Sequence, residues 1–169
     1  VGNLPWGMPI PYQGKTLKSE EAFIRKAFEL VTDIGDIIFV IPATILNSAI
    51  YKSFREEYCV YLNLVIELPN NIVPNSGLKS ALIRFSKKKK ETISLGKIDS
   101  FQIPKSYQEY IIKEISNSNI DDRWDVDYYI NQDKEIYKEL DGFTTKKLKD
   151  IAEIVKGVYL KPVQHPSKE

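Results

Sequence analysis

The sequence predicts an α/β fold: an open sheet with helices between its strands, followed by a small, mostly helical C-terminal extension. Residues 19–31 have the apolar spacing of an amphipathic helix. Residues 37–41 are continuously apolar, which is typical of a central strand covered on both faces, and residues 60–68 indicate another long strand. Beyond residue 98 the chain becomes polar and aromatic without long apolar runs.

The first elements are a loop and a capped helix. Residues 7–18 are rich in Gly and Pro and lack periodicity, which predicts a surface loop. In the helix predicted over 19–31, Ser19 is the expected cap, and Glu20 and Glu21 suit the positive end of the helix dipole. Its expected apolar face consists of Phe23, Ile24, Ala27, Phe28 and Val31.

A central strand and a second helix follow. Residues 37–41 predict the strand, which ends before Pro42. The helix is expected over residues 46–57, with Ile50 and Phe54 pointing inward. Strand, helix and strand in alternation indicate an open sheet.

Three further strands complete the predicted sheet. Residues 60–68 and 78–85 are joined by a short loop, so the second strand is expected to run antiparallel to the first. Residues 91–96 suggest an edge strand. Between them, the four lysines of residues 87–90 favour a solvated strand end, with phosphate contact as the alternative.

The C-terminal part predicts mainly helices. A helix is expected over residues 106–117, an irregular stretch over 119–129, and short helices over 133–140 and 145–155. Trp124 is expected to pack against the sheet, because neighbouring aspartates would repel the phosphates of a nucleic acid.

The composition excludes several classes of protein. The 169 residues carry a net charge of only +1, so any nucleic-acid contact must be local. One cysteine, Cys59, and one histidine, His165, leave no internal disulfide and no zinc site, which favours a reducing, cytoplasmic setting. No apolar run approaches the ~20 residues of a membrane span. The chain lacks an initiator methionine, which suggests a fragment or a processed chain.

The first residues, VGNLPWG, carry a recognisable chemistry. The Asn3 amide and the carbonyl of the next residue are two acceptors that can converge on an exocyclic amine. Pro5 stiffens the turn, and Trp6 can stack on the base that bears the amine, a contact worth roughly 1–3 kcal/mol. A turn with a hydrophobic plug is the alternative interpretation.

This stretch resembles the N-P-P-[Y/F/W] motif of adenine-specific amino-methyltransferases. The segments FIRKAFELVTDIGDIIFVIPATIL and VIELPNNIVPNSGLKSALIRFSK resemble the sequence that follows that motif in the methylation subunits of type I restriction-modification systems. The resemblance covers residues 1–98. It implies the later strands of a Rossmann-like, S-adenosylmethionine-dependent methyltransferase sheet, with the last strand antiparallel.

The resemblance also implies roles for individual residues. Asn3 and the carbonyl of Leu4 would accept from the adenine amine beside Pro5, and Trp6 would stack on the base. Leu4 replaces the usual proline, although only its carbonyl is required. Val73 stands where the family often has phenylalanine on the opposite wall. Apart from the resemblance, Lys79 is a candidate to bind substrate through a phosphate, and a solvated strand residue is the favoured alternative.

The cofactor and partners follow from the same resemblance. The family's glycine-rich loop for S-adenosylmethionine precedes the motif, so the cofactor is expected only in the complete protein. Residues 99–169 contain DRWDVDYY and KKLKDIAEIVKG, which resemble the start of a target-recognition region in specificity subunits. Two domains are therefore expected, 1–98 and 99–169, with double-stranded DNA and possible specificity and restriction subunits as partners. No membrane contact is expected.

Two other functions stay open at this point. The chain could be a non-catalytic module that binds DNA or another subunit. Alternatively, a methyltransferase with this motif could act on an RNA adenine or on a protein glutamine, because both present a planar amine.

Overall fold

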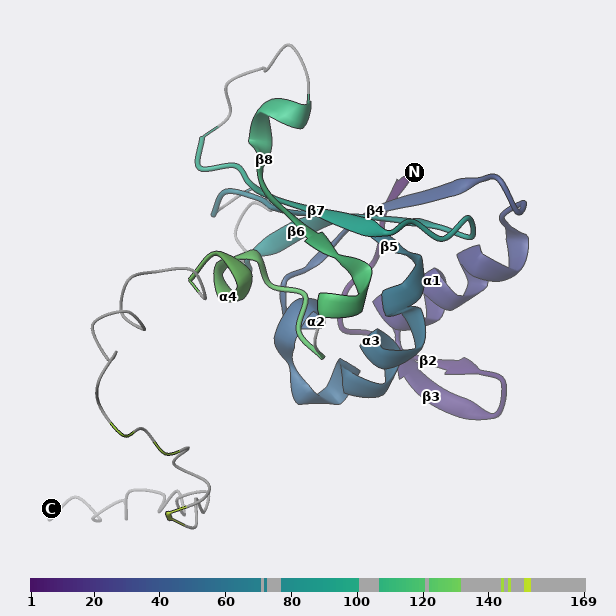
Figure 1. The fold of residues 1–169 in the computed structure, drawn as a ribbon. Helices are drawn as coiled ribbons and strands as arrows, with labels where there is room; N and C mark the ends of the chain where they lie inside the picture. The colour runs from purple at the N-terminus through teal and green to yellow at the C-terminus, as the bar shows by residue number, and fades with distance from the viewer. Residues whose placement is uncertain are drawn as a thin grey trace, which may run out of the picture. The chain divides into compact units, whose positions relative to one another are not determined.

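Six strands form one mixed sheet in the order β1-β4-β6-β5-β7-β8 (Figure 1). Their bounds are Gly2–Asn3 (β1), Asp36–Pro42 (β4), Leu62–Glu67 (β5), Ser80–Ser86 (β6), Thr92–Lys97 (β7) and Ile111–Ser116 (β8). The computed structural model describes residues 1–70, 72, 77–100, 107–120, 122–131, 144, 146 and 151–152. By their contacts, Val1–Asp133 form one compact unit and Lys134–Glu169 another.

The strand directions confirm the predicted mixed α/β sheet. β1 pairs parallel with β4, and β5 pairs parallel with β7. β6 lies between β4 and β5 and is antiparallel to both, as predicted for residues 78–85. The strands β1, β4, β5 and β7 therefore share one direction, and their carboxyl ends meet at one edge of the sheet.

The helices of the described residues cover one face of this sheet (Figure 1). They are α1 (Ser19–Leu30), α2 (Thr44–Asn47), the 3₁₀ turn η1 (Ala49–Tyr51), α3 (Lys52–Tyr58) and α4 (Val126–Asn131). On β4, Ile37 and Ile41 belong to the core beneath the helices, whereas Ile38 and Val40 are half-buried on the opposite face. Period-two alternation therefore sets which strand residues form the core.

The predicted loop over residues 7–18 is wrong in its second part, which forms a β-hairpin. β2 (Pro9–Tyr12) pairs antiparallel with β3 (Lys15–Lys18). Gln13 and Gly14 make the turn, both with positive φ, at 46° and 78°. Two such residues suit the tight turn of a two-residue hairpin, because their twist matches that of the strands.

The first helix is confirmed, but its predicted cap is wrong. α1 begins at Ser19, and Lys18 occupies the cap position without a side-chain hydrogen bond to the helix. The Ser19 hydroxyl instead accepts from the amide of Met8 and contacts the carbonyl of Pro5. Phe23, predicted inward, is 44% exposed.

The helix predicted over 46–57 is divided into α2, η1 and α3. Ser48 lies between α2 and η1 with extended dihedral angles, which breaks the helical phase. Phe54 is 1% exposed as predicted, but Ile50 is 68% exposed, so its predicted inward orientation is wrong. A four-residue spacing places two side chains on one face only within a continuous helix.

The helix predicted over residues 106–117 is also wrong. A 3₁₀ turn, η3 (Tyr107–Tyr110), leads into strand β8. β8 pairs with β7, so residues 91–96 form an interior strand and not the predicted edge strand. Gly96 permits this pairing, because a Cβ atom there would lie 2.4 Å from the carbonyl oxygen of Tyr110.

After β8, a short 3₁₀ turn, η4 (Asn117–Asn119), leads to a segment that packs back on the core. Trp124 is fully buried, with ring centroids 5.9 Å from Phe54 and 5.8 Å from Phe85, which confirms its predicted packing. The helices predicted over 133–140 and 145–155 lie outside the described residues, as does His165. Within the described part of the chain, no helix is long and apolar enough to cross a membrane.

Candidate functional site

A cavity of about 470 Å³ opens at the carboxyl ends of β1 and β4. Ligands of open α/β sheets bind outside the carboxyl ends of the strands, and this volume is in the range of small-molecule sites. Three chain segments and the first turn of α1 line it. The residues are Trp6, Gly7, Glu20, Pro42, Ala43, Thr44, Asn47, Tyr51, Gly77, Leu78 and Lys79.

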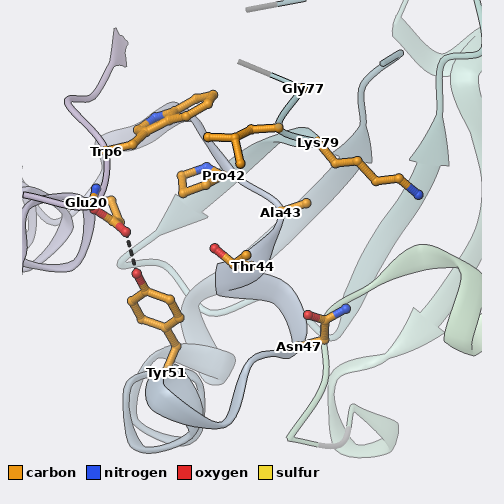
Figure 2. Close-up of a pocket in the computed structure, with 11 residues that line it drawn as sticks. Trp6, Glu20, Pro42, Ala43, Thr44, Asn47, Tyr51, Gly77 and Lys79 are labelled. Atoms are coloured by element: carbon orange, nitrogen blue, oxygen red, sulfur yellow. Dashed lines mark hydrogen bonds between the residues drawn. The ribbon is translucent and has the colours of Figure 1, made fainter. Parts of the chain in front are cut away.

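The two ends of the cavity differ in chemistry (Figure 2). Trp6 and Pro42 supply apolar surface at one end, beside the carboxylate of Glu20. Thr44 and Asn47, from α2, and Lys79, from the segment before β6, bring polar groups to the other side. The cavity therefore presents a flat aromatic ring together with hydrogen-bond donors.

Strand pairing and helix α1 together fix the segment that carries Trp6. Asn3 is in register with Val40, and Leu4 is buried in the core. Gly7 then turns with a φ of 73°, and its amide donates to Glu20 Oε2 at 2.7 Å. Trp6 is thus held between a buried leucine and a backbone hydrogen bond to the helix.

Glu20 is a buried carboxylate at the centre of this support. It is 2% exposed and accepts hydrogen bonds from the Gly7 amide and the Tyr51 hydroxyl, and the Ser19 hydroxyl lies 3.1 Å from its Oε2. Burial raises the pKa of Glu20, but these hydrogen bonds outweigh it and hold the pKa below its ordinary value. Burial and the contact with Glu20 raise the pKa of the Tyr51 hydroxyl. Glu20 is therefore an ionised, fully engaged group and not a free acid.

The structure separates the residues that the sequence singled out. Trp6 and Lys79 line the same cavity, although they are far apart in the sequence. Asn3 and Pro5 are exposed and Leu4 is buried, and none of the three belongs to the cavity lining. Val73 lies outside the described residues. The catalytic and substrate-binding roles of these residues stay predictions.

Nine of the lining residues were not predicted as part of a site, and four of these have polar side chains: Glu20, Thr44, Asn47 and Tyr51. Glu20 has the sequence signature of an ordinary acidic residue in a first helical turn. Thr44 and Asn47 follow the apolar strand that ends at Pro42, and polar residues directly after such a strand are the signal that could have indicated them. Among the described residues, no group of His, Cys, Asp and Glu could hold a metal ion.

No protein-family model matches the chain. A search of curated proteins finds no similar sequence. The fold of this chain is similar to that of a modification subunit ascribed to a type I restriction enzyme from Vibrio vulnificus YJ016. The alignment has 18% identity and a TM-score of 0.51, and it covers 66% of this chain and 27% of that chain.

Two other solved structures are similar over shorter or weaker alignments. The EcoKI M protein of a type I restriction enzyme gives 15% identity and a TM-score of 0.47, over 66% of this chain and 27% of that one. A protein from Listeria monocytogenes ascribed to the class I S-adenosylmethionine-dependent methyltransferases gives 19% identity and a TM-score of 0.45, over 58% and 35%. The chain thus spans about a third or less of each of these proteins. The TM-score of 0.51 to the Vibrio vulnificus modification subunit supports a shared fold and says nothing of activity.

Proposed function

We propose that this chain is part of an adenine-specific DNA methyltransferase of a restriction-modification system, and that the cavity receives the target adenine. The observation that carries this proposal is the position of Trp6. It lines the cavity at the carboxyl end of β1, three residues after Asn3, the spacing of the motif that the sequence resembles. An indole at this point offers a stacking surface for a planar base.

In this proposal the adenine leaves the duplex, because its amine is otherwise engaged in the base pair. The ring stacks on Trp6, and the amine donates to Asn3 Oδ1 and to the carbonyl of Leu4, which lie outside the cavity lining, so the base would also contact the end of β1. Asn3 is exposed, and within the described part of the chain its side chain makes no hydrogen bond, so the amide is available to a substrate. The two acceptors orient the amine lone pair outward and stabilise the positive charge that develops on nitrogen during transfer.

The charge of the cavity favours a base over the cofactor. S-adenosylmethionine carries a sulfonium and an ammonium group, which need anionic or carbonyl acceptors. Among the described lining residues Glu20 is the only acid, and its oxygens already accept from Gly7 and Tyr51. The described lining residues therefore do not fit S-adenosylmethionine. In the proposal, the cofactor belongs to the rest of the complete protein.

Ser19 and Glu20 act as positioning residues in this scheme. Ser19 holds the carbonyl of Pro5 at 2.8 Å, and Glu20 holds the amide of Gly7 at 2.7 Å, one residue on each side of Trp6. Because the backbone is held on both sides of Trp6, the indole ring loses less conformational freedom when a base stacks on it.

The test is methyl transfer by the complete protein, with labelled S-adenosylmethionine and DNA, RNA or protein as acceptor. Asn3→Ala is expected to abolish transfer to DNA adenine while cofactor binding, measured by calorimetry, is unchanged. Asn119→Ala, at an exposed asparagine in η4, is the matched control and should leave transfer intact.

Retained transfer by the Asn3→Ala protein would refute the catalytic assignment. Transfer to RNA or to a protein glutamine would replace the proposed substrate. DNA binding without transfer to any acceptor, by a complete protein that binds the cofactor, would favour the non-catalytic module.

A further inference from the structure

The polar end of the cavity is not used by the proposed contacts to adenine. Asn47 and Lys79 both line it and lie on the side away from Trp6 (Figure 2). Both are exposed, and within the described part of the chain neither side chain makes a hydrogen bond or an ion pair. Their hydrogen-bonding capacity is therefore free for a ligand.

The donors at this end suit an anion. The Lys79 ammonium has three donors and no acceptor, and the Asn47 amide adds two donors. The Thr44 hydroxyl, one helical turn before Asn47, also lines the cavity. The ionised carboxylate of Glu20 lies beside Trp6, away from Asn47 and Lys79, so the described residues at the polar end include no carboxylate (Figure 2).

Asn47 sits on a segment that the core holds firmly. The amide of Trp124 donates to the carbonyl of Leu46 at 2.7 Å. The buried guanidinium of Arg55 donates to the carbonyls of Ile45 and Ser48, both at 2.8 Å. These bonds flank Asn47 in the sequence, so its backbone position is fixed before any ligand arrives.

We propose that Asn47 and Lys79 bind the phosphate of the nucleotide whose base stacks on Trp6. This inference rests on the proposed function and assigns the second end of the same cavity. A stacking surface and a set of free donors then recognise the two chemical parts of one nucleotide. A protein glutamine would offer the planar amide but no phosphate, so the subsite selects a nucleic-acid strand.

The experiment compares adenosine with adenosine 5′-monophosphate on the full chain by calorimetry. The monophosphate is expected to bind about tenfold more tightly, since a hydrogen bond to a charged group contributes about 1.5 kcal/mol or more. Lys79→Ala and Asn47→Ala should each remove most of this preference. Trp6→Ala should weaken both ligands alike and leave their ratio unchanged. Lys88→Ala is the control, because it removes the same charge at an exposed position outside the cavity lining.

A second measurement uses a short single-stranded oligonucleotide that contains one adenine, titrated at several salt concentrations. Loss of one phosphate contact in Lys79→Ala should reduce the salt slope by about 0.7, whereas Lys15→Ala, at an exposed lysine outside the cavity lining, should leave it unchanged. This titration tests the phosphate subsite if the mononucleotides bind too weakly for calorimetry.

The outcomes separate this inference from the proposed function. Equal binding of the two ligands, or an unchanged salt slope in Lys79→Ala, overturns the phosphate subsite. If Trp6→Ala still weakens adenosine, the stacking role survives that result. A phosphate preference that persists while Trp6→Ala has no effect supports the subsite and refutes the stacking role.

Discussion

Replacing Glu20 tests how the loop that carries Trp6 is held in place. The carboxylate accepts from Gly7 and Tyr51 and contacts the Ser19 hydroxyl, in a site where it is 2% exposed. Glu20→Ala leaves the Tyr51 hydroxyl and the Gly7 amide without an acceptor, while Ser19 keeps its bond to the Pro5 carbonyl, and each unpaired donor costs about 1–3 kcal/mol. We therefore expect Glu20→Ala to lower the free energy of unfolding by about 3–5 kcal/mol.

Glu20→Gln keeps the shape and one acceptor oxygen but loses the charge. Because the Tyr51 hydroxyl can rotate to accept from the new amide, most contacts survive as neutral hydrogen bonds, at a cost of about 1–2 kcal/mol. Both losses in the free energy of unfolding are measured by urea unfolding at neutral pH. A larger loss for Glu20→Ala than for Glu20→Gln indicates that hydrogen bonds to the carboxylate oxygens, and not packing alone, stabilise this loop. Equal losses in both variants would contradict the hydrogen-bond account.

The pH dependence gives an independent check on the same group. The pKa of Glu20 in the folded chain lies below the ordinary value of 4.5, because the hydrogen bonds to its charged form outweigh its burial. A lowered carboxyl pKa contributes stability that is present above about pH 4.5 and is lost as the pH falls through the folded value. The stability difference between wild type and Glu20→Gln should therefore shrink as the pH falls from about 6 to about 3.

The exposed Glu29 provides the matched control for this titration. The hydrogen bond from Lys26 and that from Tyr12 lower the pKa of Glu29. Its surface position screens these interactions, so Glu29→Gln should change the pH dependence less than Glu20→Gln does. A stability difference between wild type and Glu20→Gln that stays constant over this pH range would refute the reasoning.

Three further predictions concern other parts of the fold. Gly96→Ala should destabilise the chain by about 1–3 kcal/mol in urea unfolding, because its Cβ would meet the Tyr110 carbonyl at 2.4 Å; a change under about 0.5 kcal/mol would contradict this. Trp124→Ala should cost about 3–5 kcal/mol, since the ring is fully buried; a cost below about 1 kcal/mol would show that the core does not depend on it. The hydrogen bond to Glu29 raises the pKa of Tyr12 to about 12, so Tyr12→Phe should remove an ultraviolet titration step near that pH; an unchanged step would contradict the assignment.

The sequence predicts the inner strands well because their apolar runs have one stable solution. Residues 37–41 form most of β4, and residues 60–68 contain all of β5. The predicted cover on both faces is wrong for β4, because Ile38 and Val40 are only half-buried on the face opposite the helices (Figure 1). The region of β8 has no such single solution. Ile111, Ile112 and Ile115 fit a helical face and also a half-buried strand, and pairing with β7 decides between them. That pairing is a long-range contact, which local spacing does not encode.

The hairpin is a second case in which local chemistry misleads. Pro9 and Pro11 indicate a loop, because proline removes a donor from a strand. They are two residues apart, so both backbone nitrogens point to the same side of β2, away from the hydrogen bonds to β3. Proline at alternate positions therefore leaves the ladder intact.

The candidate site shows the same limit on prediction from sequence. Trp6 could be identified because its motif is contiguous. Glu20 could not, because its role depends on contact with Gly7 across the whole hairpin, and its position in a first helical turn offers a sufficient local explanation. Asn47 joins the cavity only because α2 folds beside the end of β4.

The antiparallel strand β6 explains why Lys79 and Trp6 share one cavity. In an all-parallel sheet, the carboxyl edge collects only the residues that follow each strand. β6 runs the other way, and its first residue, Ser80, is in register with Pro42 at the last position of β4. The segment that precedes β6 therefore reaches the same edge as the segment that follows β1. Insertion of one reversed strand thus adds a third wall to the cavity, and with it the cation that a phosphate would need.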